Sequence, residues 1–364
     1  MDKVSKCPKN VQDKKVRITK YVGILFFLVL TYKGFGNVAQ PGIYNAGGTG
    51  GFSLYFPEDQ AAYKKIQMKE EKVSIELFPG YAIIMADYQM YNSSDSFVTI
   101  KAGYPVNAFY NTNNLSNKVG VYFDSLYLFK AWVNDTITKL SILATPDNNR
   151  QSFVGFSNTN NMGKWYWWSA SFPPKAITKI SVFFVVNTND ASIRRGYTVR
   201  KYNAFVYVVE SGGIWQPPIE KATFNIFLGK GVKKRNIRGT IPESGFVYIK
   251  KEKCLQLLKS NFLPSYKDNI IISYGKQQHD FDFKEVLKND KALYEDMEIK
   301  HLKALDTSKS KAAYFGNPND IKPSFWWRAI TMLFYLGIVA CIVYLLKNFL
   351  IIAKNFIQFI KRPS

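Results

Sequence analysis

Residues 72–91, KVSIELFPGYAIIMADYQMY, contain the pattern that decides the predicted fold. KVSIEL and YAIIMADYQMY are rich in β-branched and aromatic residues, and FPG between them is typical of a turn. The first segment alternates apolar and polar residues by twos, which indicates a strand with one buried face. The stretch therefore predicts two neighbouring strands joined by a short turn.

The same pattern of strand-like segments separated by turn residues continues to residue 228. Further strand-like segments are FVTIKAGY, VGVYFDSLYLF, TITKLSIL, GKWYWWSASF, ITKISVFFVV, YNAFVYVVE and ATFNIFL. Clusters of Asn, Gly, Pro, Ser and Asp separate them, as turns do. Many short strands of this kind predict a mainly β chain, in which residues 37–230 form an antiparallel β-sandwich ectodomain, as one sandwich or as two in series.

After residue 230 the pattern changes to a mixture of strand-like and helix-like segments. ESGFVYIKKEKCLQLLK indicates a strand leading into a helix, and FDFKEVLKNDKALYEDMEIKHLKAL has apolar residues near helical spacing. Residues 231–310 are therefore predicted to be a small α+β module, and residues 311–324 a linker. GGTGG at 47–51 lacks the Lys and Ser/Thr of a phosphate-binding loop, so we expect a flexible turn there.

Apolar segments lie near both ends of the sequence. The run from Tyr21 to Tyr32 follows a basic leader and is too short to cross a bilayer, so residues 1–36 are predicted to be a signal peptide, with an uncleaved anchor as the alternative. Near the other end, 18 residues from Ala329 to Leu346 carry no charge. Residues 325–346 are therefore predicted to be a transmembrane helix.

Residues 347–364 are predicted to be a basic amphipathic tail on the membrane surface. Its lysines recur every seven residues and share a helix face. By the positive-inside rule the tail is cytoplasmic, and residues 37–324 are then periplasmic or extracellular. The residues expected at the membrane interface are Trp326, Trp327, Arg328, Lys347, Lys354 and Lys361.

The net charge of +22 invites a nucleic-acid partner, but its distribution argues against one. About half of the excess flanks the two apolar segments, where membrane topology explains it. The remainder is scattered, apart from KGVKKRNIR at 230–238. We expect that run to be a solvated loop, with a polyanion site as the alternative. Cys254 is the single cysteine of residues 37–324, so no disulfide is expected within them.

The order of strands and turns resembles a known type of domain. IQMKEEKVSIEL, PGYAIIMADYQMYNSSDSFVTIKAGYPV, WYWWSASFPPKAITKISVFF and AFVYVVESGGIWQPPIEKATFNIFL resemble VIT-type domains and an uncharacterised bacterial envelope family. The resemblance covers roughly residues 45–228 and implies a β-sandwich ectodomain rather than an activity. NIIISYGKQQHDFDFKEVL also resembles a small extracytoplasmic module linked to cell walls, with Ser273, Tyr274 and Gly275 in place of the core of its motif.

The aromatic stretch KWYWWSASFPP at 164–174 is the strongest binding candidate. On a strand, Trp165 and Trp167 face one side, and Tyr166 and Trp168 face the other. We expect both pairs to be covered by the core and a neighbouring surface; the alternative is a platform for sugar rings. Trp215, in GGIWQPPI, is the other ligand-binding candidate.

Recognisable catalytic patterns are scarce, and we expect no enzyme, no cofactor and no metal. The two histidines, His279 and His301, have no Cys or His at metal-ligand spacing. No G-x-S-x-G elbow supports a Ser-His-Asp triad, although the members of a triad need not be adjacent in sequence. A glycosidase that uses only a carboxylate pair would need a cleft holding two carboxylates within about 10 Å.

Three function classes remain. The preferred one is a membrane-anchored extracytoplasmic envelope protein with a structural or protein-interaction role. A cell-wall or polysaccharide-binding module is the first alternative, and an extracytoplasmic hydrolase is the second. The expected partners are membrane lipid and an envelope protein, with polysaccharide or peptidoglycan under the first alternative, and no nucleic acid. Asn92, Asn114 and Asn134 begin glycosylation sequons.

Overall fold

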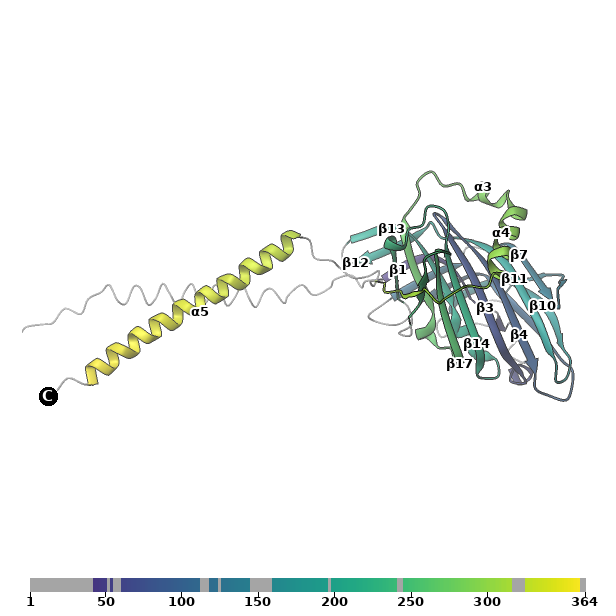
Figure 1. Ribbon diagram of the computed structural model, residues 1–364, viewed down its shortest axis with the longest axis horizontal. Helices are drawn as coiled ribbons and strands as arrows, with labels where there is room; N and C mark the ends of the chain where they lie inside the picture. Colours follow the sequence, from purple (N-terminus) through teal and green to yellow (C-terminus); the bar gives the residue numbers. More distant parts are fainter. Residues whose placement is uncertain are drawn as a thin grey trace, which may run out of the picture. The chain divides into compact units, whose positions relative to one another are not determined.

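The computed structural model describes residues 42–50, 53–54, 60–111, 118–123, 126–144, 159–195, 198–240, 245–315 and 325–360 (Figure 1). The predicted signal peptide therefore lies outside the described residues. The chain forms two compact units, Met1–Asn319 and Asp320–Ser364. The first is mainly β and the second contains one long helix, as the sequence predicted.

Two large sheets make up the first unit. Across the first sheet the strand order is β15 (Ile237–Thr240), β18 (Ile270–Lys276), β13 (Thr198–Val208), β12 (Ala191–Arg195), β1 (Gly42–Gly50), β6 (Lys118–Phe123), β5 (Val98–Asn111), β10 (Thr159–Phe172) and β9 (Ser141–Ala144), with β2 (Ser53–Leu54) paired to β5. Across the second sheet it is β19 (Lys311–Ala312), β16 (Val247–Ile249), β17 (Cys254–Phe262), β14 (Ile219–Leu228), β3 (Ile66–Phe78), β4 (Tyr81–Asn92), β11 (Ile177–Asn187), β7 (Tyr127–Val133) and β8 (Thr136–Ile137).

Most neighbouring strands are antiparallel, which confirms the predicted fold class. Three pairs are parallel within the described residues: β1 with β6, β1 with β13, and β3 with β14. The inward-facing side chains of both sheets belong to one hydrophobic core, which contains Ile84 and Val182 from the second sheet and Ile100 and Phe205 from the first. Because one core lies between the sheets, the described strands form one sandwich rather than two.

Residues 72–91 form most of the hairpin β3–β4. Ile75 lies opposite Ile84, and the chain reverses at Pro79 and Gly80. Gly80 has a φ of +101°, and the ring of Phe281 lies 2.6 Å from where a Cβ atom would stand. A side chain at position 80 would therefore be strained and would clash with that ring.

The central strands β4 and β11 are buried on both faces. Ile83, Met85 and Phe183 point away from the sandwich core and pack with Met297 of α4 (Asp290–Leu302). Helix α4 lies over this outer face of the second sheet (Figure 1). Coverage on both faces explains why YAIIMA and SVFFVV read as continuous apolar runs rather than as alternating patterns.

The prediction of a separate α+β module at 231–310 is wrong. Strands β15 and β18 complete the first sheet, and β16 and β17 complete the second. CLQLLK, expected in a helix, begins strand β17, because Leu255 and Leu257 are buried in the sandwich core. The helical prediction for the following stretch is confirmed by α3 (Phe283–Leu287) and α4.

The predicted flexible turn at GGTGG is also wrong over its first four residues. Gly47 to Gly50 belong to β1 and pair in parallel with Phe205 to Val208 of β13. Glycine is unfavourable in a strand interior and often marks close approach of another backbone. Local sequence therefore did not reveal this strand; its pairing with β13 did.

Shorter helical turns connect the strands. They are α2 (Gln60–Tyr63) and the 3-10 turns η2 (Val209–Ile214), η3 (Lys234–Asn236) and η4 (Tyr266–Asp268). The basic run at 230–238 contains η3 and is mostly exposed, and the Lys234 ammonium lies 4.3 Å from the centre of the Tyr248 ring. The stretch agrees with the expected solvated loop up to Asn236, whereas Ile237 and Arg238 begin β15.

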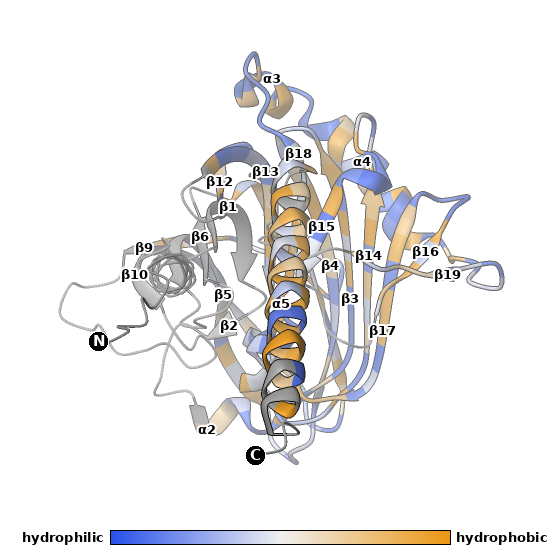
Figure 2. Ribbon diagram, turned by 90° about the vertical axis from the view of Figure 1, so that its left-hand side faces the viewer, coloured by the Kyte–Doolittle hydropathy of each residue, from blue (hydrophilic) through white to orange (hydrophobic). Residues whose placement is uncertain are grey.

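The second unit contains α5 (Phe325–Ile360), a continuous helix of 36 residues. Its stretch Ala329–Lys354 has a mean hydropathy of 2.5 and is long and apolar enough to cross a membrane (Figure 2). The sequence predicts a boundary after Leu346, but α5 continues without a break to Ile360. Residues 347–360 of the predicted tail are therefore part of the same helix as the candidate span. Trp326, Lys347 and Lys354 are exposed on α5, Trp327 and Arg328 lie in its first turn, and Lys361 lies outside the described residues.

Candidate functional site

The predicted aromatic platform is largely part of the protein interior. Trp165 and Trp168 are buried, whereas Tyr166 and Trp167 are half-buried. Tyr166 faces the sandwich core and stacks on Phe129 with ring centroids 4.8 Å apart. Across the sheet, the Trp167 ring lies 5.5 Å from the ammonium of Lys101. This stretch therefore offers at most one partly exposed tryptophan to a sugar.

Trp215, the other candidate, is also buried. It packs against the ring of Tyr63 with centroids 4.9 Å apart. The turn Val209–Ile214 and the strand β14 place it on the core side of the chain. A buried ring cannot stack on a polysaccharide, so the wall-binding alternative loses most of the residues that motivated it.

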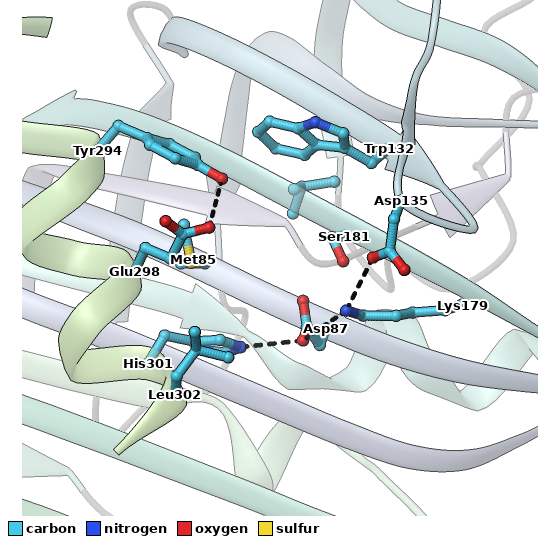
Figure 3. Close-up of a pocket in the computed structure, with 11 residues that line it drawn as sticks. Met85, Asp87, Trp132, Asp135, Lys179, Ser181, Tyr294, Glu298, His301 and Leu302 are labelled. Atoms are coloured by element: carbon cyan, nitrogen blue, oxygen red, sulfur yellow. Dashed lines mark hydrogen bonds and ion pairs between the residues drawn. The ribbon is translucent and has the colours of Figure 1, made fainter. Parts of the chain in front are cut away.

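A different group of side chains surrounds a cavity of about 190 Å³ between α4 and the outer face of the second sheet. We call it the α4 cavity (Figure 3). Its walls come from β4, β7, the turn after β7, β11 and α4. They are Met85, Asp87, Trp132, Asp135, Lys179, Ser181, Val182, Tyr294, Glu298, His301 and Leu302.

A chain of charged and polar groups crosses the floor of the α4 cavity. The Lys179 ammonium lies 3.1 Å from Asp135 and 3.7 Å from Asp87. Nε2 of His301 lies 3.3 Å from Oδ2 of Asp87, and Nδ1 of His301 is hydrogen-bonded to the Ser74 hydroxyl at 3.0 Å. Lys179, Asp87 and His301 belong to β11, β4 and α4, respectively. The packing of α4 on the sheet therefore brings these groups together.

Asp87 is the carboxylate on which these contacts converge. Burial by itself would raise the pKa of Asp87, but His301, Ser181 and Lys179 together hold it below its ordinary value of 3.8. Asp87 is therefore ionised at neutral pH. It is also the polar residue that interrupts the apolar strand YAIIMADYQMY, and this interruption was the one sequence signal that could have located the site.

The opposite wall is aromatic. The rings of Trp132 and Tyr294 lie 5.6 Å apart, and the Tyr294 hydroxyl donates a hydrogen bond to Glu298 at 2.9 Å. Burial and the neighbouring Glu298 raise the pKa of Tyr294 to about 12, so the hydroxyl keeps its proton at neutral pH. The Lys130 ammonium lies 5.2 Å from the centre of the Tyr294 ring.

Ser74, His301 and Asp87 have the residue types of a hydrolytic triad, but their arrangement does not provide a nucleophile. The Ser74 side chain is fully buried and does not line the α4 cavity. A serine nucleophile must reach a substrate carbonyl, which this hydroxyl cannot do. We interpret the three residues as a polar link between α4 and strands β3 and β4.

The α4 cavity does meet the geometric condition set for a carboxylate-pair hydrolase. Asp87 and Asp135 both contact the same lysine, so their carboxylates lie within about 10 Å of each other. Such an enzyme also needs a carboxyl that stays protonated as the acid. The low pKa of Asp87 makes that carboxylate suitable as a base or nucleophile and unsuitable as the acid.

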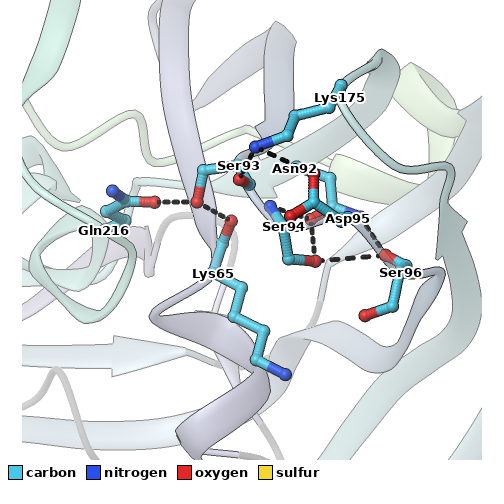
Figure 4. Close-up of polar contacts among 8 residues, drawn as sticks. All are labelled: Lys65, Asn92, Ser93, Ser94, Asp95, Ser96, Lys175 and Gln216. Carbon is cyan, nitrogen blue, oxygen red and sulfur yellow. Dashed lines mark hydrogen bonds and ion pairs between the residues drawn. The ribbon is translucent and has the colours of Figure 1, made fainter.

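A second polar cluster surrounds the turn 92–96 (Figure 4). Asn92 is buried and donates hydrogen bonds to the carbonyls of Ser96 at 2.8 Å and Phe172 at 2.9 Å. Ser93 donates to Gln216 at 2.8 Å. These hydrogen bonds satisfy polar groups of the turn and connect it to Phe172 and Gln216. We therefore interpret the cluster as structural. The sequon at Asn92 has no accessible amide in the folded chain.

Among the described residues, no group of three or more His, Cys, Asp or Glu side chains could hold a metal ion. Cys254 is buried, and burial raises the pKa of its thiol to about 12. The thiol is therefore protonated at neutral pH and is a poor nucleophile.

Comparison with known proteins adds little to this geometry. No protein-family model matches the chain, and no curated protein matches it. A candidate nutrient binding protein from Legionella pneumophila is similar in structure, with a TM-score of 0.44, 16% identity, and coverage of 77% of this chain and 94% of that chain. An M1 zinc metallopeptidase from Deinococcus radiodurans gives a TM-score of 0.29 at 6% identity.

Both TM-scores are below 0.5, so neither likeness bears on the function of this chain. The aligned region covers 57% of this chain and 42% of the metallopeptidase, less than half of that protein's length. The resemblance to a VIT-like envelope family stays a prediction from the sequence pattern.

Proposed function

We propose that this chain is a single-pass membrane protein whose sandwich lies outside the cytoplasm and has a structural or protein-interaction role in the cell envelope. The observation that carries the proposal is α5. Its candidate span of 26 residues is not buried inside the protein, and large apolar side chains such as Leu333 and Leu346 are exposed along it. Such a surface needs an apolar covering, and a bilayer supplies one.

The length of α5 fits this placement. At 1.5 Å per residue, the 18 uncharged residues Ala329–Leu346 extend about 27 Å, close to a hydrocarbon core of about 30 Å. Lys347, Lys354 and the basic residues beyond them favour a cytoplasmic end on that side. The sandwich would then lie on the opposite side.

The interaction role is supported by the outward face of α4. Ile299 and Leu302 are each 68% exposed, although the same helix buries Met297 against the sheet. Leu302 also lines the α4 cavity. Exposed apolar residues beside a cavity are typical of a surface that a protein partner covers.

Topology can be tested by labelling single cysteines in intact cells with a maleimide that does not cross membranes. We expect Ser260→Cys, on an exposed part of β17, to be labelled, and Ser364→Cys to be labelled only after the cells are permeabilised. The reverse pattern would contradict the proposed orientation.

The interaction role needs a separate test. A photo-crosslinking residue at Ile299 should give a discrete crosslinked product in membranes, and one at Ile177, 54% exposed on β11, should not. Equal crosslinking at both positions, or none at either, would remove the support that α4 gives.

A further inference from the structure

We infer that the α4 cavity binds an organic cation, namely an alkylammonium or guanidinium group. This inference goes beyond the proposed membrane role and does not depend on it. Four features of the cavity wall carry it: the balance of charge, a buried histidine nitrogen without a hydrogen bond in the described residues, the aromatic rings and the size.

The cavity wall is acidic in a strongly basic protein. Asp87, Asp135 and Glu298 line it with a single ammonium, that of Lys179, although the whole chain has a net charge of +22. Lys179 is shared between the two aspartates. Within the described residues Glu298 has no ion pair and accepts one hydrogen bond, from the Tyr294 hydroxyl. The cavity therefore carries more negative charge than its own cation neutralises.

His301 provides a second, independent observation. Its side chain is 2% exposed and lines the cavity, yet Nε2 makes no hydrogen bond in the described part of the chain. The nitrogen lies 3.3 Å from the Asp87 carboxylate, and His301 is one of the groups that lower the Asp87 pKa. The oxygens of Asp87 and Glu298 offer several acceptors to a donor with several N–H groups, which an ammonium or guanidinium supplies.

The aromatic wall suits the same ligand. Trp132 and Tyr294 are tilted by 37° to each other, and Tyr294 already has the Lys130 ammonium near its ring. Cations are attracted to the faces of tryptophan and tyrosine rings. The wall of the cavity therefore combines ring faces with carboxylates, as sites for organic cations do.

The size of the cavity limits the ligand to a group comparable to a side chain. A volume of about 190 Å³ is below the range of about 300–1,000 Å³ typical of drug-sized pockets. The cation has two sources with the same chemistry: a Lys or Arg side chain of a partner, or a small free amine. Leu302, which lines the cavity, and Ile299, on the same helix, are exposed and would contact the remainder of a partner chain.

The test is calorimetric titration of the full chain in nanodiscs of phosphatidylcholine. The probes are n-butylammonium, the neutral 1-pentanol, and the peptide acetyl-Gly-Lys-Gly-amide. We expect saturable binding of n-butylammonium and none of 1-pentanol. Glu298→Gln and Asp87→Asn should each weaken binding by about fivefold or more, because each removes an ionic contact.

Asp95→Asn is the matched control, because the Asp95 side chain is 93% exposed at the turn 92–96, away from the residues that line the cavity. It should leave binding unchanged. Trp132→Ala is a second test variant if Asp87→Asn does not fold. It should weaken the binding of n-butylammonium, although all carboxylates of the cavity are still present. Thermal melting of each variant shows whether it is folded.

The peptide separates the two sources of the cation. Binding of the peptide about tenfold tighter than n-butylammonium supports a partner side chain, and equal or weaker binding of the peptide supports a free amine. Absence of saturable binding by both cations would overturn the inference. Equal binding of 1-pentanol, or equal weakening by Asp95→Asn and Glu298→Gln, would overturn it as well.

Discussion

Glu71 is a carboxyl group enclosed between the two sheets, and its environment predicts an unusual pH dependence of stability. Only 4% of the residue is exposed, and the Tyr207 hydroxyl donates a hydrogen bond to its Oε1 at 3.2 Å. Oε2 is buried and makes no hydrogen bond within the described residues. Burial, partly offset by the bond from Tyr207, raises the pKa of Glu71 from 4.5 to about 7.

The neighbouring tyrosines extend this polar group across the core. Tyr207 is hydrogen-bonded to Tyr88 at 3.0 Å, and Tyr88 is hydrogen-bonded to Tyr104. Burial raises the pKa of all three phenols well above 10, so none is ionised at neutral pH. Glu71 is therefore the member of this network that changes charge near pH 7.

The sign of the effect follows from linkage. Between pH 4.5 and 7 the folded chain holds a proton on Glu71 that the unfolded chain has released, so the free energy of unfolding falls as the pH rises. A difference of about 2.5 pKa units corresponds to about 3 kcal/mol, because each unit is about 1.4 kcal/mol. This stabilisation is complete below pH 4.5 and is lost once the pH has risen through about 7.

Glu71→Gln keeps the shape of the side chain and removes its titration. We expect the variant to be up to about 3 kcal/mol more stable than the natural chain at pH 8, and similar in stability at pH 4.5. Urea unfolding of the full chain in a zwitterionic detergent, followed by tryptophan fluorescence, measures both. Subtracting the two pH profiles removes the contribution of every other titrating group.

Glu70→Gln is the matched control. Glu70 is the neighbouring residue on β3, its side chain is 28% exposed, and it pairs with Lys221 at 2.7 Å. The Glu70→Gln variant should keep the fall in stability between pH 4.5 and 7, because Glu71 is still present. If Glu71→Gln also keeps the natural slope between pH 4.5 and 7, Glu71 is not protonated in the folded core, and the reasoning from burial fails.

Three further predictions concern Trp168, Asn92 and Asp87. Trp168→Ala should lower the free energy of unfolding by about 3–5 kcal/mol because the ring is buried, whereas Trp167→Ala should cost less; equal losses in urea unfolding would contradict the assignment of the two rings. Asn92→Ala should cost about 1–3 kcal/mol because two carbonyls lose their donor, and a change within error would show that water replaces the amide. Asp87→Asn should lower the free energy of unfolding at pH 7. The difference in stability between the variant and the natural chain should shrink as the pH falls below 3.8, because the Asp87 pKa is lowered and its contribution is lost on protonation. A difference in stability that persists at pH 2 would indicate a packing effect instead.

The strands and the membrane helix could be predicted because their signals are local. The alternation in KVSIEL and the turn at FPG specify a hairpin without reference to the rest of the chain, and the hairpin β3–β4 is present. An uncharged run of 18 residues is sufficient to indicate a candidate span. The sequence could not show where α5 ends, because apolar and helix-forming residues continue beyond Leu346.

The α4 cavity could not be predicted, because its parts are far apart in the sequence. Asp87 and His301 are separated by more than 200 residues and meet only after α4 packs on β4 and β11. The tryptophans were named as candidates because their residue type is common in binding sites, but residue type does not reveal burial. Trp165, Trp168 and Trp215 are in the interior.

By itself, the sequence determined a mainly β chain, with strands and turns in the right order over most of residues 66–228, and an apolar helix near its end. These properties depend on the periodicity and composition of short segments. Only the tertiary structure decided that the strands form one sandwich, that β15 to β18 belong to it, and that the acidic and aromatic residues of the α4 cavity face one another. Pairings such as β3 with β14 join segments about 150 residues apart, and they depend on the packing of the whole core rather than on any local pattern.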